Sequence, residues 1–364
     1  MGVVYPVSPI TDGMHPRSIP RCYVFPDNNV YCFDENNRLR YAGPLSNLPS
    51  PSLLTAGDAR LRIITTGELY LRDSVLGTSS YVVFQKNGVA YAENGQTGYV
   101  EYSSSDVGQV IQYAINNLPN GGRVFIRAGG YVLNSTVTLS KNVVLEGEGP
   151  STYIQMGNNV NKDMIVIPAN ALNSGVANMY LDGNKANNSS GSVIKLYGYN
   201  WRPVIRHVTI RNAPQYGIAF TSTTSQYTYE AVLLDIDIGG SNLDGLSVDW
   251  CADLWGADVY SANNAGYGAA FWNATGGIIH HLHVYNNYGA AGAYVTQYAS
   301  DLRLVNAFFD TNQQNGVVIN GTRITLAECY AFNNGVSSAN SYDGIVIQNA
   351  THNVVIGCYA VDLQ

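Results

Sequence analysis

The sequence predicts an all-β protein whose larger part folds as a parallel β-helix, and three observations support this fold class. Charged residues make up only 12% of the 364-residue chain, while Gly (37) and Tyr (27) are abundant. Asn, Thr, Ser and β-branched residues replace the mixture typical of helices, which favours short strands and tight turns. Only residues 106–118 show helical periodicity. From about residue 145, a glycine followed by a short apolar strand recurs roughly every 24 residues, the period of one β-helix coil.

Charge and hydropathy exclude two kinds of partner. The net charge is −7 and no run of Lys or Arg occurs, so nucleic acid is not expected as a partner. No apolar run reaches the roughly 18–20 residues of a membrane span. The opening sequence, MGVVYPVSPITDG, does not resemble a signal peptide, because Pro6 and Pro9 interrupt its apolar residues. Either the protein leaves the cell by another route, as a virion component does, or the chain lacks its native start.

Residues 1–105 are expected to form a small β module for attachment or assembly, separate from residues 106–364. Tyr23–Gly43 and Tyr81–Ser104 each predict three strands joined by two Asn-containing turns. Arg60–Asp73 predicts a further hairpin. Cys22 and Cys32 flank a turn, so they either pair across a hairpin as a disulfide or pack as two reduced thiols.

The helix predicted at 106–118 opens the larger domain. Asp106 is placed to cap its N-terminus, apolar residues follow at helical spacing, and Asn120-Gly121-Gly122 ends it. Three strand-like segments, RVFIRAG, GYVLNSTVTL and NVVLEGEG, come next. We expect the helix to cover the open end of the β-helix core, which is otherwise an exposed edge that invites aggregation.

Each repeat consists of a glycine, a short strand and a second strand. A coil of this kind buries its inward residues only when it stacks on the next coil, about 4.8 Å away. Leucine-rich repeats have a similar period, but their framework of leucine and asparagine is absent. The repeating glycines are Gly191, Gly217, Gly245, Gly268, Gly292, Gly316 and Gly344.

Like residues in successive coils predict internal ladders. The asparagines that align just past the second strand are Asn264, Asn287, Asn312 and Asn334. We expect their amides to hydrogen-bond along the helix axis. Cys329 and Cys358 align on the inward phase and are assigned to the core. The chain stops after a strand without a cap, so we expect either a missing C-terminal portion or a partner subunit at that end.

Asp106–Gly149 resembles the start of the pectate lyase superfamily β-helix. The shared pattern is a capping helix, then Gly121-Gly122, a strand, the Ala-Gly-x-Tyr of Ala128–Tyr131, and the Leu-x-Gly-x-Gly of Leu145–Gly149. The resemblance covers about 70% of the chain and implies a right-handed parallel β-helix. The superfamily includes pectate lyases, polygalacturonases, epimerases and viral tailspikes. It therefore implies a polysaccharide or cell-surface glycan as partner, without fixing an activity.

One candidate site lies on the strands that follow the repeating glycines. With the more apolar residues of each strand taken as inward, the outward residues of neighbouring coils include Asp244, Asp249, Tyr267, Trp272 and Tyr294. Sugar rings stack on aromatic faces, and carboxylates bind hydroxyls or transfer protons. This pattern predicts glycan binding by the aromatic residues and catalysis by the aspartates. The alternative is an ordinary surface ladder of mixed side chains.

Asn242–Gly245 resembles the Asn-Thr-Asp-Gly motif of polygalacturonases. That family also requires an Asp-Asp pair, a Gly-His-Gly and an Arg-Ile-Lys on the following coils. The matching positions hold Tyr267-Gly268, Ala291-Gly292 and Val318-Ile319-Asn320, so these three motifs are missing. An inverting hydrolase needs a separate acid and base. The polygalacturonase reaction is therefore not carried over to this chain.

A second candidate site lies on the second strand of each coil. Carboxylates and imidazoles cluster there, and such groups bind a divalent metal such as calcium or, through Asp258, act as acid or base. The alternative is a set of Asp–His pairs that stabilise a solvated face or a subunit contact. His280 falls on the inward phase and is assigned to the core or a turn. The clustered residues are Asp235, Asp237, Asp258, His281 and His283.

These observations favour a glycan-binding attachment protein of the tailspike kind, located on a virion surface or outside the cell. We expect such a protein to be a homotrimer that uses its flat outward faces as interfaces. The alternative is a polysaccharide lyase or glycoside hydrolase, which the missing motifs count against, although tailspikes often cleave the receptor they bind. A third possibility is a structural β-helix of a cell surface.

Overall fold

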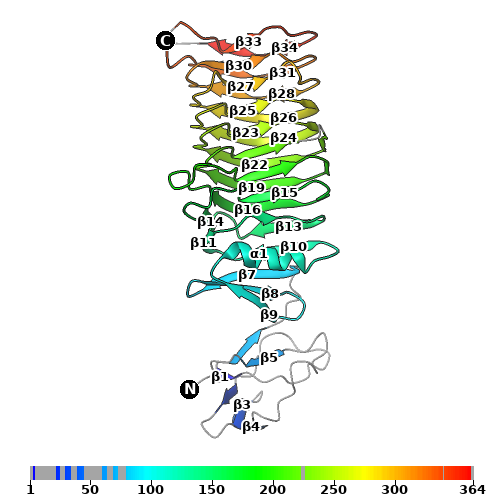
Figure 1. Ribbon diagram of the computed structural model, residues 1–364, viewed down its shortest axis with the longest axis vertical. Helices are drawn as coiled ribbons and strands as arrows, with labels where there is room; N and C mark the ends of the chain where they lie inside the picture. The colour runs from blue at the N-terminus through cyan, green and yellow to red at the C-terminus, as the bar shows by residue number, and fades with distance from the viewer. Residues whose placement is uncertain are drawn as a thin grey trace. The chain divides into compact units, whose positions relative to one another are not determined.

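The computed structural model describes residues 79–222, 226–338 and 340–361, together with the backbone of six strands between residues 3 and 72. The chain forms two compact units. One consists of Met1–Gly77 with Gln96–Gly98, and the other of Thr78–Gly95 with Tyr99–Gln364. The larger unit is the stack of coils that runs from cyan to red in Figure 1.

The smaller unit contains antiparallel strands. Its first sheet consists of β1 (Val3–Val4), β2 (Cys22–Val24), β3 (Asn29–Phe33) and β4 (Leu39–Pro44), and a separate hairpin consists of β5 (Arg60–Ile63) and β6 (Leu69–Arg72). These strands agree with the hairpins predicted from Tyr23–Gly43 and Arg60–Asp73. Cys22 lies opposite Cys32 in the β2–β3 register. Their side chains fall outside the described residues, so the disulfide stays a prediction.

Three antiparallel strands begin the larger unit: β7 (Tyr81–Lys86), β8 (Val89–Asn94) and β9 (Val100–Ser104). The sequence pattern groups them with the N-terminal module, whereas contacts within the structure group them with the coils. The reason is that β7 pairs in parallel with β10 (Gly122–Ile126), so the ladder of the coils continues onto the three strands.

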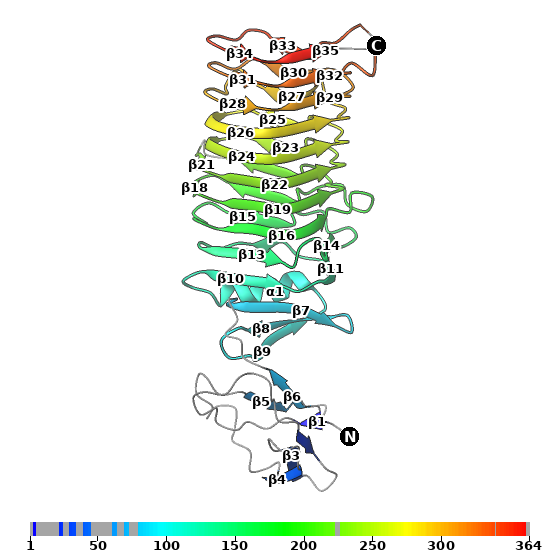
Figure 2. The same ribbon diagram turned by 180° about the vertical axis from the view of Figure 1, so that it is seen from behind.

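The helix α1 (Val107–Asn116) lies at the N-terminal end of the coils, at the level of β7 and β10 in both views (Figures 1 and 2). Asp106 caps it as predicted, because its carboxylate accepts the Gly108 N–H at 3.0 Å. The same carboxylate accepts the Asn134 N–H and the Ser135 hydroxyl, which ties the helix to the first coil. The apolar face of α1 is buried: Val107, Val110, Ile111, Ala114 and Ile115.

Each coil contributes strands to two parallel sheets. The main sheet takes one long bent strand or two short strands from a coil, and the nine-strand sheet takes one. After β10, the main sheet contains β11 (Gly129–Leu133), β13 (Val143–Gly147), β14 (Thr152–Met156), β16 (Gly175–Asp182), β18 (Asn200–Trp201), β19 (Val204–Arg211), β21 (Thr228–Tyr229), β22 (Val232–Gly239), β24 (Cys251–Ala262), β26 (Ala274–Tyr285), β28 (Arg303–Val305), β29 (Phe308–Asp310), β31 (Thr325–Ala327), β32 (Tyr330–Phe332), β34 (Val354–Ile356) and β35 (Tyr359–Val361).

The nine-strand sheet lies on another side of the same coils. Its strands are β12 (Val137–Thr138), β15 (Ile165–Ile167), β17 (Ile194–Tyr197), β20 (Ile218–Thr221), β23 (Leu246–Val248), β25 (Ala269–Phe271), β27 (Ala291–Val295), β30 (Asn315–Ile319) and β33 (Ile345–Ile347). All of its described pairings are parallel and continuous in register from coil to coil. The predicted parallel β-helix is therefore confirmed.

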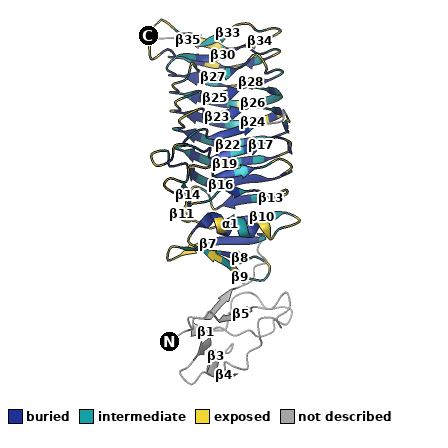
Figure 3. Cartoon of the chain, viewed as in Figure 1, coloured by how far each residue is buried: buried dark blue, intermediate teal, exposed yellow. Residues whose placement is uncertain are grey.

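The strands of the coils are largely buried, as their dark blue colour in Figure 3 shows, and most of the buried residues are apolar. Alternate residues of each strand point inward, and the largest include Phe220, Phe271 and Phe309, which are at most 2% exposed. Complete burial of such a side chain stabilises the fold by roughly 1.5–3 kcal/mol. Because this burial is between coils, it depends on the stacking of neighbours.

The predicted asparagine ladder is present and buried. Asn264, Asn287 and Asn312 each donate an Nδ2–H to the Oδ1 of the next ladder asparagine, at 2.9–3.1 Å. The same Oδ1 accepts the backbone N–H of the donating residue at 3.1–3.2 Å. The ladder therefore satisfies both side-chain and backbone groups inside the turn, where water does not reach.

The repeating glycines make room for this ladder. A Cβ at Gly245, Gly268 or Gly292 would lie 2.3–2.7 Å from the amide nitrogen of the ladder asparagine packed against it. None of the three has a positive φ, so space, and not backbone conformation, requires glycine there. The glycine repeat and the asparagine ladder are thus two sides of one contact.

Coils bend where a single residue takes the left-handed backbone conformation, with φ between 50° and 75°. These residues stack in three columns. Bend column 1 contains Asn178, His207, Asp235, Asp258, His281, Asn306 and Glu328; bend column 2 contains Arg202, Glu230, Asp253, Gly276, Asp301, Arg323 and His352; bend column 3 contains Asn212, Gly240, Asn263, Asn286, Thr311 and Asn333. Asn and Asp tolerate this conformation better than most residues with a Cβ, and they fill ten of these twenty positions.

The last described coil leaves apolar side chains exposed. Val354, Val355 and Ile356 are 45–61% exposed. Cys358 lies in the column of Cys329, as predicted, and both are free thiols. Cys329 is fully buried, whereas Cys358 is partly exposed because it lies in the last described coil.

Replacing Asn287 by Ala should lower the free energy of unfolding by roughly 2–4 kcal/mol. The change leaves the buried Asn264 N–H and amide without their acceptor, and each lost buried hydrogen bond costs about 1–3 kcal/mol. Urea denaturation measures the loss. Gln297→Ala, at an exposed position, serves as the control; equal stability of the two variants would contradict a structural role for the ladder.

Replacing Asn306 by Val should destabilise the fold by about 1–2 kcal/mol, because a β-branched residue is strained in the left-handed region. Asn306→Gly is the matched variant and should change stability little, since glycine adopts this conformation freely. Both are compared by urea denaturation. A Val variant as stable as the Gly variant would show that the bend does not need this backbone conformation.

Candidate functional site

Three half-buried aromatic rings gather on the outer face of the nine-strand sheet. Tyr267 and Tyr294 stack with ring centres 5.0 Å apart and planes 10° apart. Trp272 contacts both, at 6.2 Å from Tyr267 and 6.0 Å from Tyr294. We call this group the aromatic trio. The structure thus brings together the three aromatic residues that the sequence predicts for glycan binding.

The aromatic trio lies over small outward residues. Ala270 and Ser247 point away from the core, yet they are only 0% and 6% exposed. Trp272 donates its Nε1–H to the Ser247 hydroxyl at 3.1 Å, and Asn320 donates to the Tyr294 hydroxyl at 2.9 Å. Trp272 and Tyr294 are therefore held in place by hydrogen bonds, and the three rings form a partly exposed platform.

Asp244 lies beneath the edge of this platform. It is 7% exposed, and its Oδ1 accepts the Tyr267 N–H at 2.9 Å. Burial raises the pKa of its carboxyl group to about 6, although the hydrogen bonds from Tyr267 and Ser247 oppose the shift. A carboxyl group with this pKa exchanges a proton near neutral pH, as a general acid or base requires.

Asp249 lies on the same coil as Asp244 and is partly exposed. Its Oδ1 accepts an N–H from the Asn273 side chain at 2.6 Å. Burial is the main cause of the raised pKa of Tyr216. The negative charges of Asp244 and Asp249 raise this pKa further, because both carboxylates lie near the Tyr216 hydroxyl. The two aspartates therefore occupy one acidic region next to the aromatic trio, as predicted.

The second candidate cluster lies on the main sheet and divides into separate pairs. His281 Nδ1 lies 2.8 Å from Asp258 Oδ1. Asp235 pairs with His207 at 2.9 Å. His283 contacts Asp310 at 2.6 Å. These contacts run between adjacent coils. They match the alternative stated above, in which the cluster consists of Asp–His pairs.

The same cluster does not fit a metal ion. Asp237 is hydrogen-bonded to the Arg211 guanidinium. Asp258 is a bend residue of β24, whereas Asp237 lies in the straight part of β22 on the adjacent coil. Within residues 79–222, 226–338 and 340–361, no group of three or more His, Cys, Asp or Glu side chains is placed to hold a metal. We therefore derive no step through calcium or another metal.

His280 is exposed, so its assignment to the core or a turn is wrong. Ile279 is buried before it, His281 takes the left-handed conformation after it, and Leu282 is buried again. The bend residue interrupts the alternation of inward and outward side chains. Inward and outward residues therefore cannot be assigned by simple alternation across a residue of bend column 1.

Five further aromatic residues, which the sequence analysis did not single out, gather where coils pass from the nine-strand sheet to the main sheet. Trp201 and Tyr229 are neighbours in the β18–β21 register, with ring centres 5.8 Å apart. Tyr227 packs edge-on against Trp250 at 5.4 Å. We call this group the aromatic patch: Tyr199, Trp201, Tyr227, Tyr229 and Trp250. Trp201 and Tyr229 are separated by 28 residues, like Val204 and Val232 in the strands that follow them, so aligning these two second strands would have revealed the pair.

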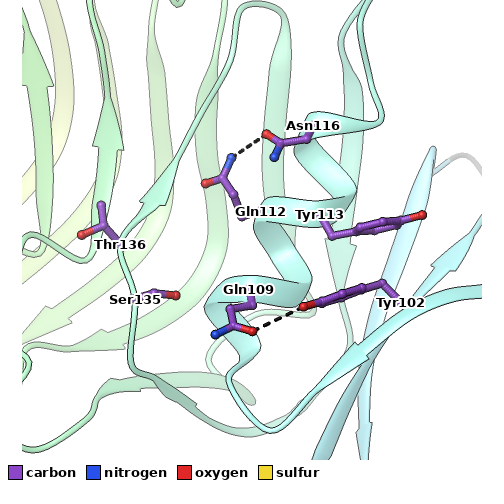
Figure 4. Close-up of a pocket in the computed structure, with 7 residues that line it drawn as sticks. All are labelled: Tyr102, Gln109, Gln112, Tyr113, Asn116, Ser135 and Thr136. Atoms are coloured by element: carbon purple, nitrogen blue, oxygen red, sulfur yellow. Dashed lines mark hydrogen bonds between the residues drawn. The ribbon is translucent and has the colours of Figure 1, made fainter.

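A shallow pocket lies beside α1, away from both predicted clusters (Figure 4). Two hydrogen bonds join its side chains: Tyr102 donates to Gln109 at 3.3 Å, and Gln112 donates to Asn116 at 3.0 Å. Tyr113 stacks on Tyr102, with ring centres 4.8 Å apart. The pocket contains none of the predicted site residues and no charged side chain, and we assign it no function.

Comparison with known protein families agrees with this architecture. Residues 192–360 match the family model described as a right handed beta helix region. The match includes the coils that carry both predicted clusters and the aromatic patch. The fold and the match together define a right-handed parallel β-helix protein. No curated protein sequence matches the chain at a significant level.

Solved structures of two kinds share the fold. The A-module of the Azotobacter vinelandii mannuronan C-5 epimerase AlgE4 is 18% identical, with a TM-score of 0.55, over 71% of this chain and 95% of that one. Full-length tailspike protein 2 of the Escherichia coli bacteriophage CAB120 is 13% identical, with a TM-score of 0.57, over 98% of this chain and 54% of that one. The Dettilon tailspike protein is 11% identical, with a TM-score of 0.53, over 77% of this chain and 62% of that one.

At these identities the likeness shows the fold alone. The chain spans about half the length of the CAB120 tailspike that it matches. Within the described ranges, no helix combines the length and apolar character needed to cross a membrane.

Asp244 should make the stability of the fold fall as pH rises. An unfolded aspartate ionises near pH 3.9, so between about pH 4 and about pH 6 the folded chain retains a proton that the unfolded chain has lost. The free energy of unfolding therefore decreases across this window, by about 3 kcal/mol at most. Asp244→Asn has no carboxyl group to ionise and should gain stability relative to the wild type over the same window.

Urea denaturation at about pH 4 and about pH 7 measures this difference. Asp253→Asn, which removes an exposed carboxylate, is the control. If the stability difference between Asp244→Asn and the wild type is the same at both pH values, the raised pKa of Asp244 is refuted.

Proposed function

We propose that this protein recognises a polysaccharide or cell-surface glycan, and that the aromatic trio is its contact surface. The observation that carries the proposal is the stacked pair of Tyr267 and Tyr294 with Trp272 against it, held over small residues and beside two carboxylates. Flat rings with one solvent-facing side suit the apolar faces of sugars. The partly exposed Asp249 provides a carboxylate at the edge of the rings for hydroxyls.

The setting that fits this activity is attachment to a cell surface, on a virion or outside the cell. Two of the solved structures that share the fold are named as tailspike proteins. A parallel β-helix also presents a long rigid face on which binding groups keep fixed positions. We further propose that the protein acts as a homotrimer, the symmetric assembly for which its outward faces are suited. Analytical ultracentrifugation of the full chain measures this state.

Trp272→Ala should weaken glycan binding by roughly tenfold or more, the loss expected when a central aromatic contact is removed. Binding is measured on an array of bacterial polysaccharides and oligosaccharides, with calcium and with a chelator. Tyr330→Ala is the matched control, because Tyr330 stacks on Phe308 at 5.3 Å and 11° but lies on the main sheet. Equal loss in both variants, or none in either, would contradict the assignment of the aromatic trio.

A polysaccharide lyase or glycoside hydrolase is the second candidate, and the raised pKa of Asp244 favours it. In that case Asp244 would transfer a proton at the glycosidic linkage held on the aromatic trio. The same array is therefore scored for reducing and unsaturated ends. Release of ends that is lost in Asp244→Asn, while binding persists, would establish an enzyme.

Two other results are informative. If Asp258→Ala abolishes the release of reducing or unsaturated ends and Asp244→Asn does not, the catalytic site would lie on the main sheet. Absence of both binding and release would favour a structural β-helix of a cell surface.

A further inference from the structure

The aromatic patch and the aromatic trio are joined through a pair of polar residues. Trp250 of the patch directly follows Asp249, and Asn273 directly follows Trp272 of the trio. Asp249 and Asn273 are hydrogen-bonded between their coils at 2.6 Å. The two aromatic groups therefore flank one carboxylate–amide pair.

Together the two groups extend along the axis of the coils. Trp201 lies on the coil of β17, Tyr229 on the next, Trp250 on the third, Trp272 on the fourth and Tyr294 on the fifth. Four steps between coils, each about 4.8 Å, correspond to about 19 Å. This axial length exceeds one sugar ring. Because Trp201 and Tyr229 lie in the main-sheet register and Tyr294 lies in the nine-strand sheet, a ligand that touches both groups crosses the coils obliquely.

The aromatic patch offers the two kinds of group that sugars need. Tyr199 and Trp201 are 38% and 37% exposed, so their rings are open to a ligand. Arg202 lies over Trp201, with its guanidinium carbon 6.0 Å from the ring centre, and forms an ion pair with Glu230. The ion pair supplies hydrogen-bond donors and acceptors at the edge of the rings.

The charges along this surface disfavour an acidic ligand. Among the described residues, Arg202, which lies over the Trp201 ring, is paired with Glu230. Lys195, which lies over the neighbouring Tyr197 ring, is paired with Asp163 at 3.3 Å. Asp244 and Asp249 add carboxylates without matching cations in the ion pairs of this surface. A polyuronate would therefore meet negative charge without compensation, which costs binding energy.

We propose that the aromatic patch is a second carbohydrate subsite, and that it and the aromatic trio form one track for a long, uncharged oligosaccharide. The proposal rests on the glycan binding proposed for the trio and adds both the second subsite and the class of ligand. A short ligand occupies one group of rings, whereas a long one spans both and gains the contacts of each.

The test uses the full chain and an array of neutral oligosaccharides and oligomannuronate, each as disaccharide and octasaccharide. For the neutral sugar that binds, Trp201→Ala combined with Tyr229→Ala should lower octasaccharide affinity about tenfold and leave affinity for the disaccharide, held on the trio, unchanged. Trp272→Ala should lower both. Tyr330→Ala, on the main sheet, should lower neither. Trp201→Ala alone and a thermal unfolding curve of each variant separate lost contacts from lost folding.

The outcomes distinguish this inference from the function on which it rests. Wild-type affinity for octasaccharide in the double variant would overturn the second subsite and leave the trio in place. Tighter binding of oligomannuronate than of any neutral sugar would overturn the uncharged ligand. If no sugar binds to the wild type, the proposed function itself fails, and the track fails with it.

Discussion

The contact between a buried asparagine and a glycine of the neighbouring strand governs the rest of this fold. Each ladder amide occupies the space that a Cβ would fill at Gly245, Gly268 or Gly292. In these coils, the strand of the nine-strand sheet therefore begins at equivalent positions. The residue just before each glycine then takes a fixed outward position. Asp244 precedes Gly245 and Tyr267 precedes Gly268, and their 2.9 Å hydrogen bond links adjacent coils. The platform for sugar binding is therefore positioned by the internal ladder.

The bend columns impose a second constraint. A residue in the left-handed conformation turns the chain within a single position, so a coil closes without a long loop. Where Asn or Asp fills the position the backbone cost is small, but bend column 1 also accepts His207, His281 and Glu328. The side chains of the two histidines reach adjacent coils and are hydrogen-bonded to Asp235 and Asp258. Asp235, Asp258 and His281 of the second cluster are thus accounted for by coil-to-coil pairing along a bend. Asp237 and His283 pair on the strand, with Arg211 and Asp310.

The sequence predicts those parts of the molecule that repeat. The glycine period, the four aligned asparagines and the cap at Asp106 each depend on local spacing, and all three agree with the structure. The aromatic trio follows from strand alternation because its strands have no bend inside them. His280 does not, because a left-handed residue beside it shifts the phase. The aromatic patch and the burial of Asp244 are not visible in any single repeat, since both depend on which side chains meet across coils.

Binding and catalysis make different demands on the same surface. Stacking needs exposed ring surface, which the partly exposed Tyr267, Trp272 and Tyr294 provide, while hydrogen bonds hold Trp272 and Tyr294 in place. Proton transfer needs a carboxyl group within hydrogen-bond reach of the sugar, about 2.6–3.2 Å. Asp244 is 7% exposed and engages the Tyr267 backbone, so a substrate would reach it only if the platform moved. The geometry as it stands thus supports recognition directly, whereas catalysis at Asp244 requires a conformational step that exposes the acid.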